Sequence, residues 1–353
     1  MKNKNIAFYV AYPYYFPHFL PIAKEFEKIN DVNVTFVLCN KQNPDLMVEI
    51  VKKENFDYLI GEENLFKIEA DFIFFANIFK NSERLKAKKI FMDHGVGTKA
   101  CNFKSALETN DIVLVEGDYR ETALSRDFPL FKHKIKKVGF SKLDQIINTP
   151  STEIDDLYKK YKLDRSKKTI LYAPTFFPSS VEKMSDTFPN EFINCNIIVK
   201  PHYLSLERRQ YKNQQNKFKK WKKYNNCTVC DLSENSLIPF IIIADLMISD
   251  ESSAIFEFTA LNKPVILNKF LKLRWSYYLF PNKLRNRMDR GIDFYRQIGD
   301  NAFSYCEMVK MVNNNLQNPQ KYEGIRKKYT RDICGIVDGN VSKRIVEILL
   351  ASC

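Results

Sequence analysis

The sequence predicts an α/β protein made of two doubly wound domains, each with a parallel sheet covered by helices on both faces. The length of 353 residues suits two domains of about 150 residues each. Short runs that are apolar on both faces alternate with amphipathic stretches, which is typical of parallel strands buried between helices. Hydrophobic residues make up 45% of the chain and aromatic residues 14%, which excludes a disordered protein.

The first series of strands predicts an N-terminal domain over residues 1–148. The stretch LPIAKEFEKI at 20–29 has the spacing of an amphipathic helix and lies between the first two strands. The expected strands are the apolar runs 6–12, 32–39, 58–61, 70–76, 89–93 and 111–117.

A second series of strands predicts another domain over residues 169–340. A polar, charged stretch at 149–168 lacks strand character and is interpreted as a linker region. The last stretch, 341–353, has the pattern of an amphipathic helix that packs back on the N-terminal domain. The strands expected in the second domain are 169–175, 195–201, 227–231, 244–250 and 263–268.

Charge and cysteine usage narrow the setting of the protein. The 55 Lys and Arg against 42 Asp and Glu give a net charge of +13, which favours an anionic partner: nucleic acid, an anionic membrane or a phosphorylated substrate. The eight cysteines are scattered, which suits a reducing cytoplasm. Only Cys227 and Cys230 are closely spaced, and they are interpreted as strand packing because no further ligand follows at zinc-site spacing. No metal site, signal peptide or membrane-spanning run is expected.

Polar side chains follow several predicted strands. Asp93 and His94 end the strand in IFMDHGVGTK, and Thr175, Lys200 and His202 lie at the ends of two others. Ligands of doubly wound sheets bind outside the carboxyl ends of the strands, so these residues predict a binding site. The residues that end a fourth strand are Asp250, Ser252 and Ser253, and they precede the helical pattern AIFEFTAL, whose N-terminus can bind phosphate.

These elements, in this order, resemble the CDP-glycerol glycerophosphotransferases of teichoic-acid and capsule synthesis, the TagB/TagF type. The resemblance covers most of the chain from about residue 90 onward. The matching elements are HG…K (His94, Gly95, Lys99), the loose G-x-P-R-x-D match GFSKLD (139–144, with Ser141 and Lys142 for Pro and Arg), YAPT (172–175), K-P-H (200–202), the element from Ala244 to Ser253, and Asp338-Gly339.

The resemblance implies a GT-B-like fold whose two Rossmann-type domains face each other across a cleft, with the acceptor on the N-terminal half and the nucleotide on the C-terminal half. It implies transfer of glycerol phosphate, or a similar polyol phosphate, from CDP-glycerol to a hydroxyl of an undecaprenyl-diphosphate-linked saccharide, with release of CMP. The preferred hypothesis is that the protein is a primase of teichoic-acid or capsule-type polymers. No cofactor is expected besides the donor substrate, and a homo-oligomer is left open.

The resemblance also suggests roles for the strand-end residues. His94 is the candidate general base, because an imidazole titrates near neutral pH, and Asp93 or a backbone carbonyl would fix its tautomer. His202 is a second catalytic candidate, while His18 and Asp93 are placed on the acceptor side. The donor-binding candidates are Lys99, Thr175, Lys200, Asp250, Ser252, Ser253 and Glu257.

Two basic stretches, 206–223 and 269–290, raise the question of a surface partner. The second mixes cations with aromatic residues, which suits an anionic membrane interface, so a cytoplasmic enzyme bound peripherally to the inner face of the cell membrane is expected. The residues predicted to contact the membrane are Lys272, Arg274, Trp275, Tyr277, Tyr278 and Phe280.

Two alternatives stay open at this stage. A GT-B sugar transferase or a sugar-nucleotide epimerase would share the strand-end serines and an acid on the following helix. A nucleic-acid-binding protein would explain the charge of +13 and the stretch 206–223. The second alternative is weakened because no RNP, helix-turn-helix or OB pattern is found in the sequence.

Overall fold

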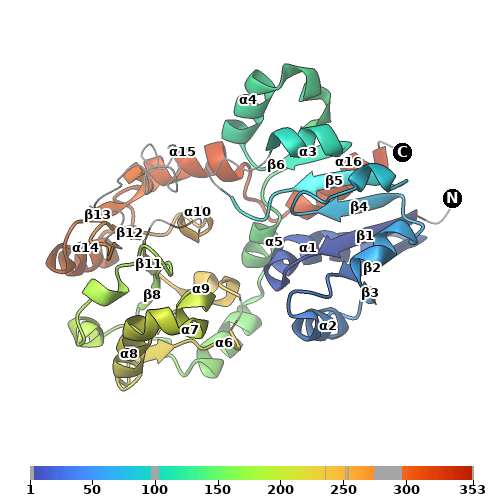
Figure 1. Ribbon diagram of the computed structural model, residues 1–353. Coiled ribbons are helices and arrows are strands. Elements are labelled where there is room, and N and C mark those ends of the chain that lie inside the picture. The colour runs from blue at the N-terminus through green and yellow to red at the C-terminus, as the bar shows by residue number, and fades with distance from the viewer. Residues whose placement is uncertain are drawn as a thin grey trace. The chain divides into compact units, whose positions relative to one another are not determined.

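The computed structural model describes residues 4–96, 103–234, 236–250, 252, 254–273 and 296–351, which divide into two compact units (Figure 1). Among these residues, the first unit runs to Val96, continues from Phe103 to Asn148 and ends with the residues from Arg331 onward. The second unit runs from Thr149 to Thr330. Each unit is a doubly wound α/β fold, so the predicted fold class is confirmed.

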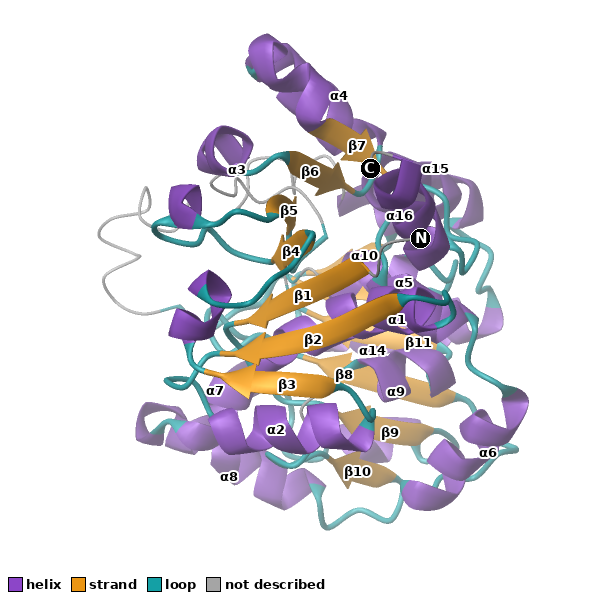
Figure 2. Cartoon of the chain, turned by 90° about the vertical axis from the view of Figure 1, so that its right-hand side faces the viewer, coloured by secondary structure: helices purple, strands orange, loops and turns teal. Residues whose placement is uncertain are grey.

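The sheet of the first unit has seven parallel strands in the order β3-β2-β1-β4-β5-β6-β7, and Figure 2 shows β1, β2 and β3 side by side. The order reverses between β1 and β4, which makes their carboxyl ends a topological switch point. The strands are β1 (Lys4–Val10), β2 (Val32–Leu38), β3 (Asp57–Ile60), β4 (Phe72–Phe75), β5 (Lys88–Met92), β6 (Ile112–Val115) and β7 (Ile135–Lys137). The helices are α1 (Phe16–Glu27), α2 (Pro44–Lys53), α3 (Phe103–Thr109), α4 (Asp118–Asp127), α5 (Lys142–Ile147) and α16 (Val341–Ala351).

Stacked phenylalanines fix the register of the central strands of this sheet. Phe8 of β1 lies opposite both Phe36 of β2 and Phe74 of β4. The ring centroids are 5.2 Å apart for Phe8 and Phe36 and 4.6 Å apart for Phe8 and Phe74. Phe19 of α1 covers the same ring at 5.3 Å. A shift of one residue would turn these buried rings to the other face, so the aromatic contacts specify the pairing.

The sheet of the second unit has six parallel strands in the order β10-β9-β8-β11-β12-β13. Here the order reverses between β8 and β11, again a switch point. The strands are β8 (Thr169–Ala173), β9 (Asn196–Val199), β10 (Cys227–Val229), β11 (Leu246–Ser249), β12 (Val265–Asn268) and β13 (Asp300–Ala302). The helices are α6 (Ser151–Lys160), α7 (Tyr203–Glu207), α8 (Lys212–Trp221), α9 (Ile238–Ile243), α10 (Ala254–Thr259), α14 (Tyr305–Gln317) and α15 (Glu323–Cys334), and α15 passes from the second unit into the first.

The structure differs from the predicted domain limits in two places. The stretch 149–168, expected to be a linker, contains helix α6 and belongs to the second unit. Its Tyr158 hydroxyl donates to the Ile243 carbonyl at 3.3 Å, and Tyr161 is buried against Phe240 with ring centroids 4.9 Å apart. Residues 331–340, expected in the second domain, belong to the first unit. The sequence of residues 149–168 suggested a linker because its apolar side chains are few and widely spaced among charged residues.

The basic stretch 206–223 begins at the end of α7 and contains the whole of α8. On α8, the side chains of Gln214, Phe218 and Trp221 recur at helical spacing and are buried. Lys217, on the same side of the helix, is partly buried and pairs with the carboxylate of Asp186 at 2.7 Å, whereas Lys212, Lys219 and Lys220 are exposed. The run of cations is therefore largely the outer face of a helix that covers the second sheet. Nowhere in the described ranges is a helix both long and apolar enough to cross a bilayer.

The C-terminal helix is attached to the first unit by a buried carboxylate. Asp144 accepts hydrogen bonds from the backbone N–H groups of Val341, at 3.1 Å, and Ser342, at 2.7 Å, in the first turn of α16. These are N–H groups that a helix cannot satisfy internally, and a carboxylate also interacts favourably with the positive end of the helix dipole. Val341, Ile345 and Leu349 of α16 then join the apolar core of the first unit.

The glycine of the GFSKLD element, which also contains Asp144, permits the close approach of α16. Gly139 has a φ of +106°, and a Cβ atom there would lie 2.7 Å from Cγ2 of Val341, so a side chain would collide with the helix. Asn148 donates from Nδ2 to the carbonyl of Gly339 at 2.8 Å. The elements GFSKLD and Asp338-Gly339 thus meet in space, and their most direct role is to attach α16.

We expect Asp144→Ala to lower the free energy of unfolding by about 1–3 kcal/mol, because two buried N–H groups lose their acceptor. Asp144→Asn keeps one carbonyl oxygen and should lose less. The exposed Asp127, which pairs with its neighbour Arg126, provides the control, and Asp127→Ala should leave the urea midpoint unchanged. An Asp144→Ala protein that unfolds at the wild-type midpoint would contradict the anchoring role.

Candidate functional site

The carboxyl edge of the first sheet carries the histidine that the sequence singled out. Strand β5 stops at Met92, and the next residue, Asp93, turns its carboxylate back to accept the backbone N–H of His94 at 2.8 Å. The His94 side chain is 40% exposed. The rings of Tyr14 and Tyr15, from the turn after β1, flank the imidazole with centroid distances of 5.6 and 5.0 Å. The imidazole is therefore held between elements and still reaches solvent.

A backbone carbonyl fixes the proton on the imidazole of His94. Nδ1 of His94 lies 2.9 Å from the carbonyl oxygen of Ala76, the residue that follows β4. A carbonyl only accepts hydrogen bonds, so Nδ1 carries the proton and Nε2 of the neutral ring keeps its lone pair. The nearer carboxylate oxygen of Asp93 is 3.4 Å from Nδ1. Of the two groups proposed to set the tautomer, the carbonyl makes the closer contact.

His18, expected on the acceptor side, lies in the interior of the first unit. Its side chain is 2% exposed and packs edge-on against Phe140 at 5.2 Å. Nδ1 has no hydrogen-bond partner among the described residues. Burial, and then the nearby charge of Lys142, hold the pKa of His18 well below its usual value. Such burial favours a packing role, because α1 turns this side chain inward rather than toward an acceptor.

In the second unit, Asp250 organises the carboxyl edge of the sheet. It follows β11 and is completely buried. Its carboxylate accepts hydrogen bonds from the backbone N–H of Thr175 at 3.0 Å and from the hydroxyls of Ser179 and Ser180 at 3.2 and 2.5 Å. Burial raises the pKa of Asp250 to about 6. Its carboxylate therefore positions the 175–180 loop, and its predicted role in donor binding stays a prediction.

Thr175 was also predicted to contact the donor, and its hydroxyl is engaged within the same loop. Its Oγ1 donates to the carbonyl of Pro178 and lies 3.2 Å from the Asp250 carboxylate. The residue is only partly exposed. Because a hydroxyl has a single proton, Thr175 could donate to a phosphate only by giving up a bond that shapes the loop.

His202 has the opposite proton arrangement to His94. It precedes α7, and its Nδ1 accepts the backbone N–H of Leu204 at 3.1 Å. In the neutral ring the proton is therefore on Nε2, which is a hydrogen-bond donor. The residue is exposed, and its ring lies against Phe176 with centroids 4.7 Å apart. Lys200, two residues earlier, is partly buried, and this burial lowers the pKa of its amine.

The remaining predicted residues are only partly placed. Ser252 caps α10 by accepting the Ala254 N–H at 3.3 Å, and Glu257 on the same helix is 4% exposed, so it is not an ordinary solvated residue. Lys272 is exposed, and its backbone N–H donates to the Ser179 carbonyl at 2.6 Å. The predicted residues that lie outside the described ranges are Lys99, Ser253, Arg274, Trp275, Tyr277, Tyr278 and Phe280.

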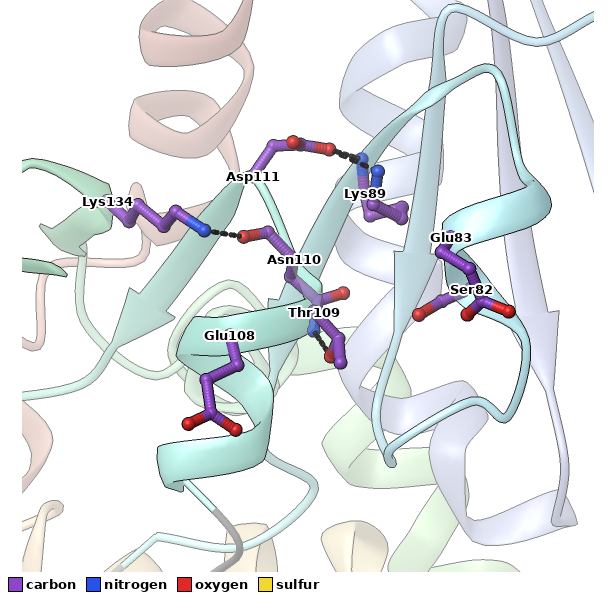
Figure 3. Close-up of a pocket in the computed structure, with 8 residues that line it drawn as sticks. All are labelled: Ser82, Glu83, Lys89, Glu108, Thr109, Asn110, Asp111 and Lys134. Carbon is purple, nitrogen blue, oxygen red and sulfur yellow. Dashed lines mark hydrogen bonds and ion pairs between the residues drawn. The ribbon is translucent and has the colours of Figure 1, made fainter.

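A polar hollow of about 250 Å³ lies elsewhere in the first unit (Figure 3). Lys89 and Asp111, which pair at 2.9 Å on its wall, mark the amino-terminal ends of β5 and β6. Lys134 donates to the Asn110 carbonyl at 2.8 Å and so ties together two parts of the same wall. This hollow is at the edge of the sheet opposite to His94, and no predicted site residue lines it.

Comparison with protein families gives a match over most of the chain. The family model described as CDP-Glycerol:Poly(glycerophosphate) glycerophosphotransferase matches residues 85–351. The matched range contains His94, His202 and Asp250. It also contains the residues that attach α16.

Curated relatives are similar at a lower level of identity. The chain is 24% identical over 253 residues to the teichoic acid glycerol-phosphate primase of Bacillus subtilis (strain 168), covering 70% of this chain and 59% of the relative. It is 25% identical over 185 residues to the teichoic acid ribitol-phosphate primase of Bacillus spizizenii (strain ATCC 23059 / NRRL B-14472 / W23), covering 48% and 45%. The chain thus spans about half the length of the curated relatives it matches.

Solved structures are similar in fold. The wall teichoic acid polymerase TagF superimposes with a TM-score of 0.71 at 17% identity, covering 100% of this chain and 90% of that chain. A UDP-GlcNAc 2-epimerase from Neisseria meningitidis superimposes with a TM-score of 0.66 at 12% identity, covering 99% and 100%. At these identities the likeness establishes the arrangement of strands and helices but not the reaction.

The buried carboxyl of Asp250 predicts a pH effect on stability. Its pKa in the folded protein, about 6, is above the ordinary aspartate value of about 4, so the folded protein binds this proton more tightly than the unfolded chain. The stabilisation is fully present below about pH 4 and is lost as the pH rises through about 6. We expect the urea midpoint to fall more steeply from pH 4 to 7 in the wild type than in Asp250→Asn.

Asp186→Asn provides the control for this measurement. Lys217 and Lys220 lower the pKa of the exposed Asp186 to about 2, so this carboxyl is ionised in the folded protein throughout the range. Because an unfolded aspartate titrates at about pH 4, losing Asp186 should alter the slope only slightly, at the acid end, and should not flatten it. Equal slopes for the wild type and Asp250→Asn would mean that Asp250 does not titrate as its burial requires.

Proposed function

Because this chain belongs to the CDP-glycerol:poly(glycerophosphate) glycerophosphotransferase family, we propose that it transfers glycerol phosphate, or a similar polyol phosphate, from a CDP-linked donor to a hydroxyl of a lipid-linked saccharide and releases CMP. The observation that carries the proposal is the opposite protonation of two histidines at strand ends. In the neutral rings, Nε2 of His94 carries a lone pair and Nε2 of His202 carries a proton. One imidazole is suited to accept a proton and the other to donate a hydrogen bond.

His94 acts as the general base in this proposal. As the acceptor oxygen forms its bond to the phosphorus of the polyol phosphate, Nε2 of His94 takes the hydroxyl proton. The bond between that phosphorus and the bridging oxygen breaks, and CMP leaves with the electron pair. The Ala76 carbonyl keeps the base in the required tautomer. It also stabilises the imidazolium that forms, because the hydrogen bond from Nδ1 becomes stronger when the ring is charged.

The second unit stabilises the phosphates in this proposal. The Nε2–H of His202 and the amine of Lys200 follow the same strand, β9, and both offer hydrogen-bond donors to phosphate oxygens. Such donors are most effective when they are fixed before the reaction, since no free energy is then spent on reorienting them. The Leu204 N–H fixes the ring of His202, and Asp250 fixes the neighbouring loop.

The proposal also assigns a donor and an acceptor. Primases for glycerol phosphate and for ribitol phosphate are both among the similar curated proteins, so the donor is a CDP-linked polyol. We assign the acceptor to an undecaprenyl-diphosphate-linked saccharide and the role to priming a teichoic-acid or capsule-type polymer. The proposed reaction uses no cofactor besides the donor, and a peripheral site on the inner face of the cell membrane would bring the enzyme to a lipid-linked acceptor.

We expect His94→Ala to lower turnover by about 10²–10⁴-fold, the usual contribution of a general base, while the fold is kept. His202→Asn is the sharper test of the second histidine, because asparagine can still cap α7 but lacks the Nε2–H donor. This variant should also bind CDP-glycerol more weakly. The measurements are CMP release with CDP-glycerol and a lipid-linked disaccharide, and the affinity for CDP-glycerol by calorimetric titration.

His133→Ala is the matched control, since this exposed histidine lies in the short helix of residues 129–134 and has no assigned role. It should retain wild-type turnover. Wild-type turnover in His94→Ala would rule out the base assignment. Unchanged turnover and donor affinity in His202→Asn would reduce His202 to a helix cap.

The membrane part of the proposal makes a separate prediction. The protein should sediment with vesicles that contain phosphatidylglycerol and not with phosphatidylcholine alone, and about 1 M salt should weaken the binding by screening the charges. Trp275→Ala should reduce binding, while Phe303→Ala, which removes an aromatic side chain that is 70% exposed, should not. Equal binding to neutral and anionic vesicles would contradict an electrostatic attachment.

A further inference from the structure

A turn of three tyrosines lies beside His94, at the carboxyl end of β1. The turn contains the short helix Pro13–Tyr15, with proline at its first position. The Tyr15 N–H donates to the Tyr12 carbonyl at 3.0 Å. Proline restricts the backbone, and the hydrogen bond closes the turn, so the tyrosines are held in place without a ligand. The switch point between β1 and β4, where doubly wound sheets bind ligands, is at this end of the strands.

Within the turn, Tyr14 is presented to solvent by its neighbours. Its ring stacks on Tyr12 at 5.1 Å with an interplanar angle of 16°, and it meets Tyr15 edge-on at 5.0 Å. Tyr15 is 1% exposed, but Tyr14 is 49% exposed. The Tyr14 ring centroid is 5.6 Å from that of His94. A half-exposed aromatic ring, packed against Tyr12 and Tyr15, therefore lies next to the proposed base.

The chemistry of this surface selects one kind of acceptor end. A tyrosine ring offers a large, flat apolar surface at little cost in conformational entropy when it is already fixed. A sugar ring has a matching surface of C–H groups, and its hydroxyls point outward from the rim of the ring. A polyol phosphate chain end is flexible, charged and without such a face. The surface beside His94 thus fits a ring better than a chain.

We propose that Tyr14 stacks on the terminal sugar ring of the acceptor and holds the hydroxyl of that ring close to Nε2 of His94. This inference rests on the proposed function, which already assigns a saccharide acceptor, and adds to it the residue that recognises the sugar ring of that acceptor. The donor-side residues of the second unit take no part in this selection.

Binding can be measured apart from catalysis. The probe is a water-soluble alkyl-diphosphate disaccharide, titrated by calorimetry into the full-length protein without a donor, and the comparison probe is the same alkyl diphosphate without sugar. Tyr14→Ala should weaken disaccharide binding about tenfold, whereas Tyr14→Phe, which keeps the ring, should stay within about twofold of the wild type. Binding of the sugar-free probe should not change in either variant.

Phe66→Ala is the matched control, because Phe66 is an aromatic residue of the same unit with a similar exposed fraction, 39%. It should bind the disaccharide as the wild type does. Wild-type binding by Tyr14→Ala would overturn the inference, and so would an equal loss in Tyr14→Phe, which would point to the hydroxyl instead of the ring. Loss of disaccharide binding in Tyr14→Ala without any CMP release by the wild type would support the sugar surface and reject the proposed transfer.

Discussion

The position of a single proton on each of two imidazoles determines what the strand ends of this protein can do. A carbonyl next to His94 and a backbone N–H next to His202 place those protons on opposite nitrogens. Neither arrangement needs a charged partner, so each is built into the backbone of its own unit. The proposal assigns a base to the first unit and a phosphate-binding group to the second because of these two contacts.

Two buried carboxylates hold other elements of the two units in place. Asp144 receives the first turn of α16, and Asp250 gathers the N–H and hydroxyl groups of the 175–180 loop. Both belong to elements through which the sequence resembles its family. Part of that pattern therefore preserves the shape of a loop and the attachment of a helix. Burial of a carboxylate is tolerated at both places because several donors replace the lost water.

The sequence predicted the sheets and the location of the candidate site better than the contacts within it. Strand β5 and the polar residues after it were predictable because an apolar run stops abruptly at Asp93. The tautomer of His94 was not, since its partner Ala76 is 18 residues away and becomes a neighbour only when β4 pairs with β5. Asp250 was predicted to bind the donor because it follows a strand. Its burial results from the folding of the 175–180 loop over it, which the sequence pattern does not indicate. The three-residue strands β7 and β13 have too few apolar positions to give a pattern.

The most direct test of the central claim is nitrogen NMR of the protein with ¹⁵N-labelled histidine, at a pH high enough for neutral rings. Ring nitrogen shifts report which nitrogen carries the proton, and single substitutions assign the signals of the four histidines. The account predicts the Nδ1–H form for His94 and the Nε2–H form for His202. The same tautomer in both rings, or rapid exchange between forms at either, would contradict it.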